Sequence, residues 1–202
     1  MRQSLWALVL SCTLTGLPLA YAARATLTPN LSGDASRMAF KSSQKNKKQT
    51  SCQLTLMHVY TSKFNKKHTQ FAFTGSVVAK REAGTPMVLS VIGQNHQLST
   101  TGKDIKPFAT SRIELGVEEA SVRRFMGHKS PCKKHSVCAE YKDTPKHQLQ
   151  TWVSDGEKNL SLLFPLVAKQ QPVVIDLSKF PSVGHRTETP LAQFKACVAA
   201  LN

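Results

Sequence analysis

Two cysteines and two histidines fall within one stretch of eleven residues, where they could hold a metal ion. The stretch runs from His128 through Cys132 and His135 to Cys138. Zinc and copper sites use thiolate sulfur and imidazole nitrogen as ligands. However, five residues separate the two cysteines, and paired zinc cysteines commonly stand about two to four residues apart. We therefore favour a disulfide between Cys132 and Cys138 and keep metal binding by these four side chains as the alternative.

The chain begins with the pattern of an export signal. Residues 1–22 combine a positive Arg2, an apolar run too short for a comfortable membrane span, and the small residues of Ala20-Tyr21-Ala22, which suit signal peptidase. Removal of 22 residues from 202 discards Cys12 and leaves 180 residues. Thiols oxidise outside the cytoplasm. We therefore expect a periplasmic or secreted protein whose cysteines are paired.

Four cysteines remain after this cleavage, and an even number in an exported chain predicts two disulfides. If Cys132 and Cys138 pair within their own loop, Cys52 must pair with Cys197. That bridge would join the start of the ordered domain to its last helix. The other two connectivities of four cysteines remain open at this point.

Positive charge exceeds negative charge by a wide margin. The chain has 27 Lys and Arg against 12 Asp and Glu, a net charge of +15 that falls to +14 without Arg2. Such an excess attracts polyanions over a distance, although it also keeps a protein dissolved. Outside the cytoplasm the polyanions are lipids and polymers of the envelope or of a host, so nucleic acid is not the expected partner. The candidate anion-binding residues are Lys63, Lys66, Lys67, Lys133 and Lys134.

Motifs of common enzyme classes are absent from the sequence. It contains no Gly-x-Ser-x-Gly elbow, no phosphate-binding glycine loop and no His-Glu-x-x-His pair. We therefore expect a non-catalytic protein with no catalytic residue and no cofactor. A hydrolase whose site the sequence hides is the remaining enzyme alternative. No second apolar run approaches the roughly 20 residues of a spanning helix, so we expect no transmembrane segment in the mature chain.

Composition divides the mature chain into an arm and one domain. Residues 23–51 are polar, and the part from 41 to 50 contains four lysines and no apolar residue. Low hydrophobicity with like charges opposes folding, so the sequence predicts a flexible basic arm. Residues 52–202 have the length of one ordinary domain.

Short runs of β-branched and aromatic residues, separated by turn residues, predict strands throughout this domain. Over 111–118, apolar and polar residues alternate, which predicts one buried and one solvated face. Many short strands with two small helices indicate a mainly β protein, an antiparallel β-sandwich. The expected strands are 53–60, 70–80, 87–92, 111–118, 120–125, 159–164 and 172–177.

Two short helices are predicted by a threonine followed by proline, because threonine caps a helix and proline suits its first turn. Thr144 and Pro145 would begin the first helix, which Asp155-Gly156 ends. Thr189 and Pro190 would begin the second. Apolar residues from Leu191 to Leu201 recur at helical spacing, so this second helix is C-terminal.

The order of features over residues 132–201 resembles the invasion-associated locus B family of exported bacterial proteins. The resemblance implies a periplasmic or surface β-sandwich associated with host-cell entry, and it transfers no catalytic residue. The matching pieces are Cys132 and Cys138, the helix with Leu149 to Val153, the strand from Gly156 into Leu160-Ser161-Leu162, the segment from Val174 to Phe180, and the terminal helix from Phe194 to Leu201.

The expectation from sequence is an exported, disulfide-stabilised binding protein with an envelope or host-interaction role. Its partner would be a protein or an anionic polymer of the envelope or of a host surface. The sequence predicts no particular oligomeric state.

Overall fold

The computed structural model describes most of the chain beyond residue 35. The described residues are 36–45, 48–65, 67–99, 105–118, 122–124, 132, 135–144, 146–166, 172–180 and 188–201. The predicted export signal at 1–22 lies outside them. The same holds for His128, Lys66, Lys133 and Lys134.

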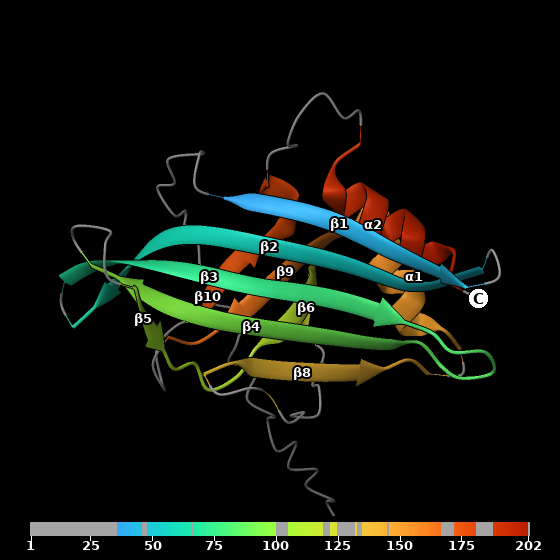
Figure 1. Cartoon of the computed structure of the whole chain (residues 1–202), viewed down its shortest axis with the longest axis horizontal. Helices are drawn as coiled ribbons and strands as arrows, with labels where there is room; N and C mark the ends of the chain where they lie inside the picture. The colour runs from blue at the N-terminus through green and yellow to red at the C-terminus, as the bar shows by residue number, and fades with distance from the viewer. Residues whose placement is uncertain are drawn as a thin grey trace, which may run out of the picture.

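A six-stranded antiparallel sheet forms the larger layer of the molecule (Figure 1). Its order is β1-β2-β3-β4, and the free edge of β4 pairs with β8 along one half and β5 along the other. The strands are β1 (Arg37–Lys45), β2 (Lys48–Phe64), β3 (Lys67–Lys80), β4 (Val88–Leu98), β5 (Ile105–Phe108) and β8 (Val137–Lys142).

A second sheet and two helices form the other layer. Figure 1 shows β6, β9 and β10 behind the larger sheet, with α1 and α2 beside them near β1 and β2. The second sheet has the order β10-β9-β6-β7. Its elements and the helices are β6 (Glu114–Glu118), β7 (Val122–Arg124), α1 (Gln148–Ser154), β9 (Asn159–Phe164), β10 (Val173–Asp176), the 3-10 helix η2 (Leu177–Lys179) and α2 (Pro190–Ala199). The predicted antiparallel β-sandwich with a C-terminal helix is thereby confirmed.

Alternation along the strands directs apolar side chains into the space between the layers. On β2, every second residue from Cys52 to Tyr60 is buried, because successive side chains of a strand point to opposite faces. These residues join one hydrophobic core with Leu162 of β9 and Phe194 of α2. We call this side of the six-stranded sheet its inner face, and the opposite side its outer face.

One phenylalanine connects the two sheets at the centre of this core. The ring of Phe73 stacks on Phe164 of β9, with centroids 4.8 Å apart and ring planes at 11°. The same ring lies over Gly75 and Gly93, which are cross-strand partners. A Cβ atom on Gly75 would stand 2.6 Å from the ring, and one on Gly93 would stand 2.7 Å from it. The ring of Phe73 can therefore lie against β3 and β4 only because Gly75 and Gly93 have no side chains.

The N-terminal part of the sheet corrects one prediction. Residues 37–45 and 48–51, predicted to belong to a flexible basic arm, form β1 and the start of β2. Met38 is buried, and Phe40 packs against the core. The prediction was wrong because average composition does not show the two apolar residues, Met38 and Phe40, that reach the core. It also does not show that β1 pairs with β2 along its whole length through backbone hydrogen bonds.

The segment that follows the paired cysteines also differs from expectation. Strand β8 was not predicted, and β4 continues to Leu98 beyond the predicted 87–92. Helix α1 begins at Gln148, so Thr144 does not cap it. The carboxylate of Asp143 instead accepts hydrogen bonds from the amides of Leu149 and Gln150, at 2.8 and 3.3 Å. A buried acceptor just after the end of β8 thus replaces the predicted threonine cap.

Helix α2 begins as predicted. The hydroxyl of Thr189 accepts a hydrogen bond from the amide of Ala192 at 3.2 Å, and Pro190 is the first helical residue. Lys195 is buried, and its ammonium group donates to the carbonyl oxygens of three residues in the turn between α1 and β9. Burial lowers the pKa of Lys195. These bonds hold α2 against that turn.

Disulfides connect Cys52 to Cys197 and Cys132 to Cys138, with Cα atoms 5.9 and 6.0 Å apart. This is the pairing that follows if Cys132 and Cys138 bond within their own loop. The first bridge joins β2 to α2 across a sequence separation of 145, whereas the second spans a separation of 6.

The close contact of the Phe73 ring with Gly75 gives a first prediction. Gly75→Ala should lower the free energy of unfolding by about 1 to 3 kcal/mol, since the new methyl group would overlap the Phe73 ring and the backbone oxygen of Ile92. Gly156→Ala is the matched control, because a Cβ there meets nothing within 4 Å. Urea denaturation measures both. Equal losses would show that the ring is not confined as described.

The two disulfides should differ in what they contribute. Replacing Cys52 and Cys197 together by serine removes a large ring, which costs about 5 kcal/mol on the chain-entropy estimate, against about 2 kcal/mol for Cys132 and Cys138 together. Thermal unfolding of the two double variants measures this difference. Similar losses would contradict it, as would free thiols in the denatured, unreduced native protein.

Candidate functional site

The cysteine and histidine stretch does not present a metal-binding cluster in the described residues. The sulfur atoms of Cys132 and Cys138 are bonded to each other, so neither is a free thiolate ligand. His135 is exposed and adopts a left-handed backbone with φ 67°. His128, Lys133 and Lys134 lie outside the described residues. Within the described residues, no group of three or more His, Cys, Asp or Glu side chains is arranged to hold a metal.

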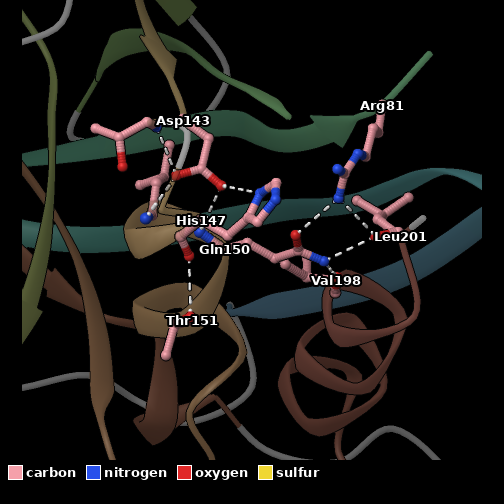
Figure 2. A network of polar contacts seen from close by, with 9 residues as sticks. Arg81, Asp143, His147, Gln150, Thr151, Val198 and Leu201 are labelled. Atoms are coloured by element: carbon pink, nitrogen blue, oxygen red, sulfur yellow. Dashed lines mark hydrogen bonds and ion pairs between the residues drawn. The ribbon is translucent and has the colours of Figure 1, made fainter. Parts of the chain in front are cut away.

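A polar network near the helices holds an aspartate, a histidine and an arginine (Figure 2). The Nδ1 atom of His147 lies 3.6 Å from a carboxylate oxygen of Asp143. That carboxylate also accepts hydrogen bonds from three backbone amides, of Thr144, Leu149 and Gln150. A carboxylate bound in this way fixes the start of α1.

The rest of the network fixes the end of α2. The side-chain amide of Gln150 donates to the carbonyl oxygens of Val198 and Leu201 at 2.9 and 2.8 Å. Arg81 donates to the Gln150 side-chain oxygen and to the Leu201 carbonyl, at 3.2 and 3.3 Å. The last carbonyls of a helix have no partner within it. Gln150 adds a second donor to the Val198 carbonyl and, with Arg81, binds the Leu201 carbonyl just beyond α2, so this network holds α1, the end of α2 and the end of β3 together.

A second polar group is buried inside the sandwich, on β2 and β4. His58 is 5% exposed, and its Nδ1 atom lies 2.9 Å from the hydroxyl of Ser36. Burial lowers the pKa of His58 to about 4. The hydroxyl of Tyr60 donates to the side-chain oxygen of Asn95 at 3.1 Å, and burial raises the Tyr60 pKa. The Nδ2 atom of Asn95 is buried without a hydrogen-bond partner in the structure.

The outer face of the six-stranded sheet is the strongest candidate for a binding site. Over residues 51–62, 69–79 and 88–98, its three central strands contain no Asp, Glu, Lys or Arg. At the usual rise per residue, such a strip is about 35 Å long. An exposed sheet surface normally carries charges that keep it from sticking to other proteins. This face lacks them along three adjacent strands.

Apolar side chains are exposed on this uncharged strip. Met57 of β2 is 38% exposed and Ile92 of β4 is 42% exposed, while Ile105 at the strip's edge on β5 is 60% exposed. Cross-strand pairing places Ser76 beside Ile92 and Thr74 beside Met57. The strip therefore alternates methyl-bearing and hydroxyl-bearing side chains on one surface.

Cations stand at the two ends of the strip and along one edge. At the turn between β2 and β3, Lys63 pairs with His68 on the outer face and is exposed, whereas the exposed Lys67 pairs with Phe64 on the inner side. The other end carries Lys45, Lys48, Lys80 and Lys142, and the β1 edge carries Arg37 and Lys41, all exposed. On β8, Glu140 adds a carboxylate at the opposite edge.

Of the predicted anion-binding residues, the structure places Lys63 on the outer face at one end of the strip, whereas Lys67 pairs with Phe64 on the inner side. The residues that sequence reasoning missed are the uncharged ones between the cations. Their signal was available, because three successive strand segments without charge stand out in a chain with 39 charged residues, 27 basic and 12 acidic.

Comparison with models of protein families, with curated proteins and with solved structures finds no match for this chain. Among the described residues, no helix is both long enough and apolar enough to cross a membrane.

His58 makes stability depend on pH. The unfolded chain takes up a proton near the ordinary pKa of 6.5, whereas the folded protein resists it until about pH 4. Stability should therefore fall as the pH drops through this window, by about 3 kcal/mol in total. His58→Gln should flatten the profile. Urea denaturation at several pH values measures the profiles, and an unaltered slope in His58→Gln would refute the assignment.

Proposed function

We propose that this protein is an exported, non-catalytic binding protein that attaches to an anionic surface of the cell envelope or of a host. The observation that carries the proposal is the uncharged strip on the outer face, framed by exposed lysines at both ends. Two disulfides and the leader-like residues 1–22 support a location outside the cytoplasm.

The cations have a direct physical role in this proposal. Groups of one sign gathered around a surface raise the local concentration of oppositely charged partners and speed their arrival. Lys63 lies at one end of the strip, and Lys80 and Lys142 lie at the other. A polyanion that contacts both ends must lie along the strip, so the uncharged side chains between them become part of the contact.

The order of elements around this surface also supports an envelope or host-interaction role. Strand β8 with its paired cysteine, the short helix α1, strands β9 and β10 and the terminal helix α2 follow one another as in the resemblance to the invasion-associated locus B family. That resemblance implies a part in host-cell entry, which we include in the proposal as its biological setting.

Retention on immobilised heparin, used as a generic polyanion, tests the proposal. The protein should bind and elute at a defined salt concentration, because salt screens exposed charges. Lys63→Gln with Lys80→Gln removes one outer-face cation from each end of the strip and should elute at clearly lower salt. Lys146→Gln with Lys179→Gln removes the same charge from exposed positions on other elements, and should elute close to the unmodified protein.

Two results would contradict the proposal. One is the absence of retention at low salt. The other is an equal shift for both double variants, which would mean that net charge alone, rather than the framed strip, determines binding.

A further inference from the structure

The outer face offers more than positive charge, and its apolar residues restrict the kind of partner that fits. Met57 and Ile92 are exposed large apolar side chains on an uncharged strip, and Ile105 extends that surface at β5. The free energy falls when exposed apolar side chains are transferred out of water. A partner matched to this face therefore combines an apolar region with negative charges.

The strip is poorly suited to stacking against sugars or bases. The aromatic residues of the central strands, such as Tyr60, Phe71 and Phe73, point inward and pack against one another and against Phe164. The outward residues of the same strands are aliphatic, hydroxyl-bearing or amide-bearing, apart from His96. Flat rings recognise sugars and nucleic-acid bases by stacking. The outer face of the central strands provides no such platform.

A second copy of the chain is disfavoured by charge. Two copies that met through this face would bring Lys63, Lys80 and Lys142 of one toward the same cations of the other. Like charges in such a contact oppose association. An anionic lipid surface presents the opposite sign to these lysines and an apolar layer to Met57 and Ile92.

We infer that the outer face lies flat on an anionic lipid bilayer, with the end lysines at the headgroups and Met57, Ile92 and Ile105 inserted at shallow depth. This inference rests on the proposed function and names the partner class of the same surface. Thr74 and Ser76 lie beside the apolar residues and supply hydroxyl donors for lipid phosphates at the headgroup level. Adsorption to anionic lipid depends both on apolar area and on positive charge.

Co-sedimentation with vesicles separates these two contributions. The mature, oxidised protein should bind vesicles of phosphatidylglycerol mixed with phosphatidylcholine, and bind pure phosphatidylcholine much less. Met57→Thr with Ile92→Thr removes apolar area without changing charge, and threonine suits a strand. We expect this variant to bind the anionic vesicles on the order of tenfold more weakly. Val174→Thr, on the outward side of β10, is the matched control and should bind normally.

The outcomes distinguish the inference from the proposed function. If the threonine double variant keeps full vesicle affinity, or if the protein ignores vesicles but is retained on heparin, the lipid inference fails and the proposed function stands. If the protein binds neither heparin nor vesicles, both fail. Sedimentation equilibrium that shows a dimer lost in the double variant would overturn the lipid inference in favour of a second copy.

A second variant covers the possibility that the threonine double variant unfolds. Met57→Trp places a fluorescent side chain in the strip, and its emission should shift to shorter wavelength when anionic vesicles are added, because indole emission responds to the loss of water. The unmodified protein, which keeps Trp152, gives the background. An unshifted spectrum at vesicle concentrations that sediment the protein would overturn the inference.

Discussion

The contact between Phe73 and Phe164 determines how the two layers of this protein meet. The neighbouring strands β3 and β4 have glycines at positions 75 and 93, and this leaves room for the Phe73 ring to stack on Phe164 between the sheets. This arrangement works in one strand register, because a slip of one residue turns every side chain to the other face. Such a slip would bring Thr55, Met57 and their neighbours into the core. The composition of the outer face therefore depends on the packing at the inner face.

Much of this fold was predictable from sequence, and the errors have local causes. Alternation on β2 and the apolar runs of β9 and β10 predict strands well, and the Thr189-Pro190 pair predicts the start of α2. Strand β1 was assigned to a flexible arm because composition does not show that Met38 and Phe40 reach the core or that the strand pairs with β2. The start of α1 was misplaced because Asp143, which caps it, precedes the apparent threonine signal.

The candidate site was predictable in part. The sequence predicted Lys63 and Lys67 among the anion-binding candidates from charge alone, and the structure places Lys63 on the outer face at one end of the strip and Lys67 on the inner side. The strip itself required the pairing of three strands, since Met57 and Ile92 lie 35 positions apart and share a surface through β3. A single strand pattern shows which residues face solvent, but not which of them are neighbours across the sheet.

The bridge between Cys52 and Cys197 has a consequence for how the chain matures. Because ribosomes build proteins from the amino end, Cys52 exists for the synthesis of a further 145 residues before its partner appears. Among the thiols synthesised in that interval, Cys132 and Cys138 lose the least chain entropy on pairing, because they close a small loop. The bridge between β2 and α2 can close only after nearly the whole domain has been synthesised.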